Sequence, residues 1–402
     1  MSPLRFDTAG ESHGPGLTAI LSGMPAGVPV DFDMLARDLA RRQHGYGRGR
    51  RMQIEQDEAE IRGGVRDGET LGSPIALWIV NRDWPNWQKV MAVGAVDAEA
   101  AERRRLHSPR PGHADLAGGR KYLRDDLRDV LERASARESA ARVAVGALAK
   151  MLLAAFGIEI RSGLRSLGSV GGDRPTPTWS DLLAVDEASP LRAIARDLEP
   201  AMIALVDEAK LRGDTLGGAV TIIAHGVPSG LGSHVAWDRK LDGRIAQAML
   251  SIPAIKGFEI GSAIAAAAGF GSAAHDAIVP GPDGTLTRPT NRAGGLEGGI
   301  TNGEDVVVTL YKKPIATLRE GLPSVDLDTG EATAAQYERS DVTAAPAAGV
   351  IGEAMLAWVL ADALIEKLGG DSLAEMQAHY ASTRELERSW PRSPSAASRR
   401  AT

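Results

Sequence analysis

Two long alanine-rich stretches constrain the fold of this chain more than any other feature of the sequence. Residues 121–156 and 343–368 both show helical spacing of apolar positions, and small residues recur along one face of the first stretch. Small side chains let two helices approach closely, so such segments are expected deep inside a protein. The sequence therefore predicts a core that contains two long buried helices.

Shorter apolar segments between these stretches predict strands. They cover residues 17–22, 73–81, 215–224, 255–268 and 306–310. A helix is predicted to start at Asp31 or Asp33, and another to span residues 199–211. There is no internal repeat and no clean linker, so we predict a single domain over residues 1–388. The polar composition of residues 389–402 predicts a disordered tail.

Composition excludes several classes of function. The net charge of −6 argues against a protein that mainly coats nucleic acid, and the lack of cysteine removes disulfides and thiolate chemistry. The eight histidines show no metal-ligand spacing, so no metal site is predicted. The N-terminus lacks a signal-peptide core, and we find no apolar run of about 18 residues that would span a membrane. We expect a cytoplasmic protein without a membrane partner.

Residues 41–51, RRQHGYGRGRR, contain five arginines and no acidic residue. Guanidinium groups this close repel one another unless an anion lies among them, and arginine forms a planar fork that fits phosphate and carboxylate. The glycines let the backbone approach such an anion. At this point a nucleic acid, a small phosphorylated molecule and solvent all remain possible occupants.

Other motifs place proton carriers beside cations, and each has a simpler structural interpretation. His13 lies in a glycine-flanked turn, and His113 follows Arg110 in RPGHAD. Arg133 and Arg137 share a face of a helix that looks buried, where they bind either a ligand or neighbouring glutamates. The glycine-rich stretch 294–303 and the following KKPIAT are weak evidence for a phosphate cradle. Asp341 is either a helix cap or an acid–base group.

Together and in this order, the motifs resemble those of the chorismate synthase family. The resemblance runs through TAGESHGPGLTAIL, RRQHGYGRGRRM, SPRPGHADL, ERASARES, GGLEGGITNG, KKPIATL and ERSDVTAAPAAG, and so covers nearly the whole chain. It implies an α+β fold, a β-α-β sandwich with long central helices between antiparallel sheets, assembled as a homotetramer. The chain lacks an obvious insertion, which implies the bacterial, monofunctional type.

The resemblance also implies a reaction. Members of the family are lyases that remove phosphate from 5-enolpyruvylshikimate 3-phosphate by 1,4-elimination and give chorismate, in the shikimate pathway to aromatic amino acids. The family requires reduced FMN (FMNH2) although no net redox change occurs. An external flavin reductase is then the implied source of reduced FMN, and no nucleic-acid partner is implied.

Residue roles follow from the resemblance by matching position. His13 and His113 would act as proton carriers, with His113 protonating reduced flavin, and Asp341 would help to remove the substrate proton. The implied FMN contacts are Arg133, Ala134, Ser135, Pro253, Ala254, Gly298, Lys313, Pro314, Ile315, Ala316, Thr317 and Arg339. The implied substrate contacts, of which Arg42 and Arg48 are alternatively NADP contacts, are Arg42, Arg48, Arg51, Arg110 and Arg137.

Two positions depart from the family pattern. Ala134 stands where members often have serine, and Pro253 where many have asparagine, so neither offers a side-chain hydrogen bond. Two other functions compete with the lyase. An RNA-binding module would need aromatic residues near the arginines, where only Tyr46 is close, and a flavin reductase would consume NADPH without the shikimate substrate.

Overall fold

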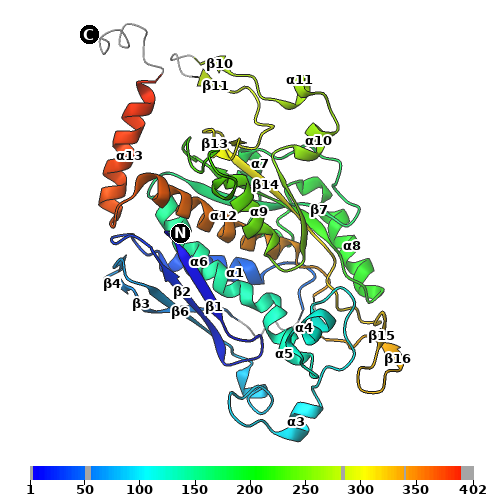
Figure 1. Ribbon diagram of the computed structural model, residues 1–402. Helices are drawn as coiled ribbons and strands as arrows, with labels where there is room; N and C mark the ends of the chain where they lie inside the picture. The colour runs from blue at the N-terminus through cyan, green and yellow to red at the C-terminus, as the bar shows by residue number, and fades with distance from the viewer. Residues whose placement is uncertain (1–2, 50–55, 282–285, 339–340, 391–402) are drawn as a thin grey trace, which may run out of the picture.

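The computed structural model describes residues 3–49, 56–281, 286–338 and 341–390. Its centre is a layer of helices between two four-stranded antiparallel sheets (Figure 1). This arrangement confirms the predicted α+β fold and its sandwich of long helices between sheets. The single-domain boundary at residue 388 remains a prediction, and most of the predicted tail lies outside the described residues.

The N-terminal sheet has the strand order β1-β2-β6-β3, built from β1 (Arg5–Ala9), β2 (Gly16–Ser22), β6 (Ile75–Val80) and β3 (Ala59–Gly63). Ile75, Leu77 and Ile79 are at most 1% exposed, whereas the residues between them are partly exposed. This alternation is typical of a sheet with one face on the core. The buried face packs against α6 (Ser139–Ala154), which contacts both β2 and β6.

The second sheet has the order β7-β8-β14-β9, built from β7 (Glu159–Leu167), β8 (Gly218–His225), β14 (Val306–Lys312) and β9 (Ile255–Ile260). Seven of the described β14 and β8 pairs run in register from Val306–Ala224 to Lys312–Gly218. The sheet packs against α12 (Ala345–Leu368), and both of its central strands are buried on both faces. Such strands lose their alternation and appear as continuous apolar runs.

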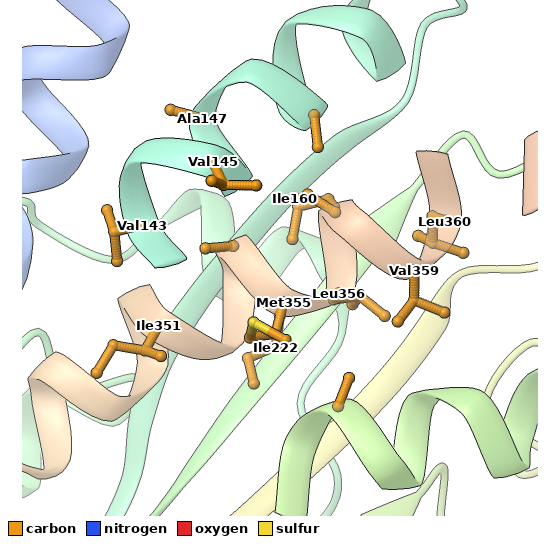
Figure 2. Packing of buried hydrophobic residues seen from close by; sticks show 14 of the residues in the cluster. Val143, Val145, Ala147, Ile160, Ile222, Ile351, Met355, Leu356, Val359 and Leu360 are labelled. Carbon is orange, nitrogen blue, oxygen red and sulfur yellow. The ribbon is translucent and has the colours of Figure 1, made fainter. Parts of the chain in front are cut away.

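The helix layer consists mainly of α6 and α12, flanked by α1 (Phe32–Gln43) and α9 (Leu241–Leu250). A Cβ placed on Gly146 of α6 would lie 2.2 Å from the Ala354 Cβ of α12, so the two backbones nearly touch. Around this contact, Val143, Ile351 and Met355 fill the interface (Figure 2). By length and hydropathy α12 resembles a membrane span, but 94% of that segment is buried inside the protein, as in a core helix.

The predicted helix over residues 121–156 is wrong as a single element. The structure has α4 (Asp115–Tyr122), α5 (Arg128–Ala134) and then α6. Leu123 ends α4 in the left-handed region, with φ of 52°, and Ser135 leaves the helical region with ψ of 140°. The second break separates the charged, partly buried α5 from the apolar α6, and residues 135–137 line the functional cavity described below.

The predicted strand over residues 255–268 is also too long. It ends at Ile260, and α10 (Ala263–Ala267) follows. The remaining elements lie outside the central layers. They are β4 (Val65–Arg66), β5 (Glu69–Thr70), α3 (Ala98–Glu102), α7 (Trp179–Leu183), α8 (Glu199–Leu211), α11 (Gly271–Ala274), β10 (Val279–Pro280), β11 (Leu286–Thr287), β12 (Leu296–Glu297), β13 (Ile300–Thr301), β15 (Pro323–Val325), β16 (Ala332–Ala334) and α13 (Leu373–Arg388).

Candidate active site

A cavity of about 1180 Å³ opens where the N-terminal segments meet the end of β14 and the start of α12. Among the described residues, nine cationic side chains line it, against three carboxylates, those of Asp83, Glu338 and Asp341. An excess of cations in one cavity selects for anionic ligands. The nine are Arg42, Arg48, Arg103, Arg104, Arg110, Arg128, Arg137, Lys312 and Lys313.

Helix α1 delivers the start of the arginine stretch to this cavity. The Asp31 side chain accepts a hydrogen bond from Met34 N and so caps the helix, as the sequence predicted. Arg41 and Arg42 occupy the last turn, where cations complement the helix dipole. The two arginines then diverge, because Arg41 enters the core whereas Arg42 lines the cavity.

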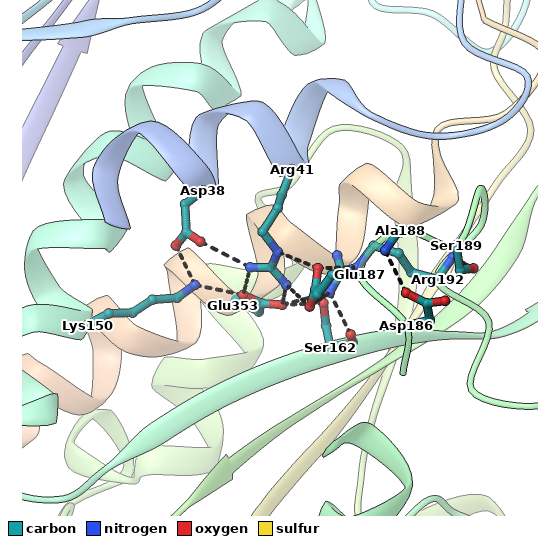
Figure 3. Close-up of polar contacts among 10 residues, drawn as sticks. All are labelled: Asp38, Arg41, Lys150, Ser162, Asp186, Glu187, Ala188, Ser189, Arg192 and Glu353. Atoms are coloured by element: carbon teal, nitrogen blue, oxygen red, sulfur yellow. Dashed lines mark hydrogen bonds and ion pairs between the residues drawn. The ribbon is translucent and has the colours of Figure 1, made fainter. Parts of the chain in front are cut away.

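Arg41 belongs to a buried charge network rather than to the ligand site (Figure 3). The Glu353 carboxylate on α12, which is 0% exposed, accepts two hydrogen bonds from Arg41 at 2.8 and 2.9 Å and one from Lys150 at 2.7 Å. Asp38 accepts hydrogen bonds from the same two cations. Burial alone would raise the pKa of Glu353, but the charges of Arg41 and Lys150 hold it well below its usual range. The network fixes the end of α1 to α6 and α12.

Arg42 and Arg137 are joined by one carboxylate. Asp57 forms ion pairs with both guanidinium groups, and all three side chains are almost completely buried. Burial would raise the pKa of Asp57, but the two arginines outweigh it and lower that pKa. The Nε atom of Arg42 is buried without a hydrogen-bond partner among the described residues. Among the described residues, the Asp57 carboxylate thus connects two arginines in this wall of the cavity.

His13 is oriented by a carboxylate and a ring. Its Nδ1 lies 2.8 Å from Oε1 of Glu132, and its backbone N–H donates to Oε2 at 2.7 Å. The imidazole stacks on Trp87 with ring centroids 3.8 Å apart. Because a carboxylate only accepts, this contact favours a proton on Nδ1. Burial would raise the pKa of Glu132, but the contacts with His13 and Arg128 lower it, so the acceptor stays ionised.

His113 has a similar arrangement. Its Nδ1 lies 2.5 Å from Oδ1 of Asp115 and 3.0 Å from Nη2 of Arg110. Nδ1 of His113 cannot form both hydrogen bonds. To accept from Arg110 it needs a lone pair, whereas to donate to Asp115 it must carry a proton. We assign the shorter one, since hydrogen bonds from His113 and Arg110 outweigh burial and hold the pKa of Asp115 well below its usual range. Arg110 therefore orders this pair, and its Nη1 also donates to Thr317 at 3.0 Å.

Asp341 lines the cavity just before the start of α12. Its Oδ2 forms an ion pair with Nη1 of Arg48 at 2.8 Å, and its Oδ1 accepts from Gly49 N at 2.6 Å. The loop that carries Arg48 is anchored by backbone hydrogen bonds from Val342 N to Gly47 O and from Tyr46 N to Pro190 O. The arginine stretch and the segment before α12 are thus tied together at the cavity wall.

Several apolar side chains also line the cavity. They are those of Ile252, Pro253 and Ala254 with Ala347 and Ile351 of α12. Ala254 has a φ of 67°, a left-handed conformation that costs a residue with a Cβ about 1–2 kcal/mol. Its carbonyl accepts from Lys313 N at 2.9 Å, which ties this strained turn to the segment 313–317. Strain of this kind concentrates at ligand sites.

Most of the residues that the sequence indicated meet in this one cavity. Arg133 does not line it, because its guanidinium donates to Thr8 O and Gly10 O beside β1. Pro314 and Gly298 are also absent from the lining, and Arg51 and Arg339 lie outside the described residues. Those that line the cavity are His13, Arg42, Arg48, Arg110, His113, Ala134, Ser135, Arg137, Pro253, Ala254, Lys313, Ile315, Ala316, Thr317 and Asp341.

Sequence reasoning missed the carboxylates that hold this site together. Asp57, Asp115 and Glu132 each neutralise an arginine and orient a partner, although they lie just behind the lining side chains. A signal existed for Asp115, which stands two residues after His113. No sequence signal joined Glu132 to His13 across 119 positions. No motif indicated that Trp87 would stack on His13. Among the described residues, no cluster of three or more metal-ligating side chains exists.

Comparison with known proteins decides the family. The family model described as chorismate synthase matches residues 4–365. The chain belongs to the chorismate synthase family. Chorismate synthase of Moorella thermoacetica is 55% identical over 382 residues, covering 95% of this chain and 98% of the relative. Chorismate synthase of Thermobifida fusca is 54% identical, covering 92% of this chain and 96% of the relative.

A solved structure supports the same assignment. The crystal structure of a chorismate synthase superposes with a TM-score of 0.75 at 44% identity, covering 94% of this chain and 97% of that one. The resemblance seen in the motifs is therefore confirmed. By its family the chain is an enzyme, a phosphate-lyase of the shikimate pathway.

Proposed function

We propose that this cavity converts 5-enolpyruvylshikimate 3-phosphate to chorismate and phosphate by 1,4-elimination, with reduced FMN as cofactor. The observation that supports it most directly is the meeting of His13, His113 and Asp341 in one strongly cationic cavity. The substrate carries a phosphate and two carboxylates, so it needs several cations and a proton donor for the departing phosphate. A site of this kind has both.

The residues present fit FMN. The cavity combines a volume of about 1180 Å³ with the apolar lining of residues 252–254 and α12. Beside it lie Lys313, Thr317 and the backbone of residues 315–317, which offer donors to a phosphate. When bound, reduced FMN supplies transient electron density that helps the phosphate to leave, without net redox change. Ala134, Ser135 and Arg339 are proposed further contacts, as are Arg133 and Gly298 from the resemblance alone.

The two histidines are proposed to move protons. Glu132 and Asp115 each accept from Nδ1 of one ring, so each imidazole is held in a defined orientation. We assign to one histidine the protonation of the departing phosphate and to His113 the protonation of the cofactor. Asp341 is proposed to accept the substrate proton, a role that its contacts with Arg48 and Gly49 would tune.

The arginines are proposed to hold the substrate. Arg42 and Arg137 both pair with the carboxylate of Asp57, and Arg48 pairs with Asp341. Arg51 is included from the resemblance. Arg110 has its donors directed to Asp115 and Thr317, so we propose that it acts by ordering His113. An NADP contact for Arg42 and Arg48 is the alternative assignment.

Three broader proposals rest on the family. We propose a homotetramer, and large exposed apolar side chains such as Phe270 and Trp237, at 85% and 86% exposure, would be covered in an assembly. We propose that a separate flavin reductase supplies the reduced FMN. We also propose a cytoplasmic location, where a flavin reductase could supply the enzyme with reduced FMN.

One anaerobic assay tests the function. Protein, chemically reduced FMN and 5-enolpyruvylshikimate 3-phosphate are mixed, and released phosphate is followed over time. We expect release with reduced FMN and none with oxidised FMN. Equal rates with both flavins would contradict the proposal, as would no release at all. Consumption of NADPH by the protein and FMN without substrate would instead indicate a flavin reductase.

A further inference from the structure

The strand β14 ends in a buried lysine that the proposed chemistry has not used. Val306, Val308 and Leu310 alternate along the strand and are each 0% exposed, and the Leu310 side chain approaches Gly352 of α12. Side chains on a strand alternate with a period of two, so Lys312 continues this row on the helix-facing side. Its pairing with Gly218 of β8 keeps that register. The row thus brings an ammonium group to the point where apolar packing ends and the cavity begins.

Lys312 is 7% exposed, and no carboxylate of the described residues forms an ion pair with it. Its Nζ donates to Lys313 O at 3.2 Å, and none of the ion pairs between described residues includes it. The charged groups that face it are Asp341, Arg48 and the neighbouring Lys313. Burial lowers the pKa of Lys312 to about 8, with Arg48 and Lys313 acting in the same direction and Asp341 opposing them. An ammonium buried in this way is costly without a partner.

The first turn of α12 adds positive potential at the same place. Ala344, Ala347 and Ala348 line the cavity, and Ala345 lies against Gly218, the register partner of Lys312. The N-terminal end of a helix bears a partial positive charge and exposed N–H donors. The lysine and the helix end therefore favour an anion in the same part of the cavity.

We propose that Lys312 is an additional anion-binding residue of this cavity, which holds a phosphate or carboxylate oxygen of the cofactor or the substrate. The identity of these ligands rests on the proposed function. Both carry the required group, so the experiment has one arm for each. An arriving anion also stabilises the ammonium form, so binding is coupled to proton uptake at alkaline pH.

The first test measures binding without turnover. Lys312→Met removes the charge at similar length, and we expect about 10- to 100-fold weaker binding at pH 7, as for loss of a hydrogen bond to a charged group. One arm titrates oxidised FMN alone, and the other titrates the substrate in the presence of oxidised FMN. Loss in the first arm places the anion on the cofactor, and loss in the second places it on the substrate. Unchanged affinity in both arms overturns the proposal. Lys210→Met, on an exposed position of α8, is the matched control.

The second test uses Lys312→Arg, which retains the positive charge. It keeps the proposal testable if the methionine variant does not fold. Titration calorimetry at pH 8.5 in two buffers of different ionisation enthalpy counts the protons taken up on binding. Arginine remains protonated at this pH, so the variant should bind the anion and take up fewer protons than the parent. Equal proton uptake by parent and variant overturns the proposal. Phosphate release by the parent is measured separately, so failure of the proposed function is distinguishable from failure of this inference.

Discussion

Arg48 and Asp341 form an ion pair of 2.8 Å that joins the arginine stretch to the segment in front of α12. The pair links Arg48, which is proposed to bind the substrate, to Asp341, which is proposed to accept a proton from the substrate. An anionic substrate that binds Arg48 competes with Asp341 for the same guanidinium group. Substrate binding would thereby loosen this ion pair at the carboxylate that is proposed to accept the substrate proton.

Replacement of Arg48 should separate the two ligands. We expect Arg48→Ala to weaken substrate binding by about 10- to 100-fold, because a charge-assisted hydrogen bond is lost. Binding of oxidised FMN should change far less. Titrations of each ligand check this, with Arg37→Ala on an exposed position of α1 as the control. Equal losses for both ligands would count against the assignment.

The contact between Asp115 and His113 predicts a graded loss of catalysis. His113→Ala should lower kcat by about 10²- to 10⁴-fold, the usual contribution of a general acid or base. Asp115→Asn keeps the shape of the side chain but removes the anion that holds the ring, so we expect a smaller fall in kcat and a shifted pH profile. Steady-state rates between pH 6 and 9 measure both effects. A His113→Ala variant with the full rate would exclude this residue from the chemistry.

The buried network at Glu353 predicts a large effect on stability. Glu353→Gln removes one of the two carboxylates that Arg41 and Lys150 share and leaves only Asp38 between them, so we expect a loss of about 3–5 kcal/mol in the free energy of unfolding. Chemical denaturation of the ligand-free protein measures it. Glu385→Gln, on an exposed position of α13, should change little. Equal stability of the two variants would show that the network is not needed for folding.

Asp57 predicts the response of stability to acid. Its pKa is lower in the folded state than in the unfolded chain, despite burial, because Arg42 and Arg137 are adjacent. A depressed pKa contributes stability above the unfolded value of about 3.9, and this stability is lost as the pH falls through the folded value. We expect the thermal unfolding midpoint of the parent to decrease as the pH is lowered below about 4. The midpoint of Asp57→Asn should depend less on pH in this range. Asp125→Asn, at an exposed position, should retain the parent profile.

Because α6 and α12 approach closely, a larger side chain at their contact should destabilise the protein. Gly146→Val must displace Ala354, whose Cβ would lie 2.2 Å from the added atom, so we expect a loss of at least about 1–3 kcal/mol. Gly63 of β3 has no atom within 4 Å of an added Cβ and an ordinary φ, so Gly63→Ala is a matched control. Thermal unfolding of both variants, compared with the parent, decides the point.

Local sequence patterns correctly predicted some helices, including one whose first turn follows a capping residue. Helix α8 matches its predicted residues 199–211, and α1 begins at the predicted Asp31 cap. The breaks at Leu123 and Ser135 could not be found, because neither glycine nor proline marks them and the helical spacing continues through both. Tertiary contacts fix them instead, including the hydrogen bond from Ser135 Oγ to Ser12 Oγ.

The sequence predicted which cationic residues form the site, but not which carboxylates form ion pairs with them. Motifs indicated Arg42, Arg110 and Arg137, yet each is held by a buried carboxylate that the motifs did not assign. The choice between a ligand and a protein partner depends on distances across the fold, which spacing along the chain does not contain. The motif KKPIAT, which begins at Lys312, indicated a phosphate cradle but not the burial of this lysine, because its burial follows from the side of β14 on which it lies.

The order of the strands and helices has a consequence for how the chain acquires its site during synthesis. β14 pairs with β8, whose residues lie more than 80 positions earlier at Val306–Ala224, and α12 packs on α6 from about 200 positions further along. Contacts this distant in sequence form slowly, because loop closure precedes the gain from packing. A nascent chain on the ribosome therefore has no complete ligand cavity until α12 has emerged, and ligands cannot assist its folding before that stage.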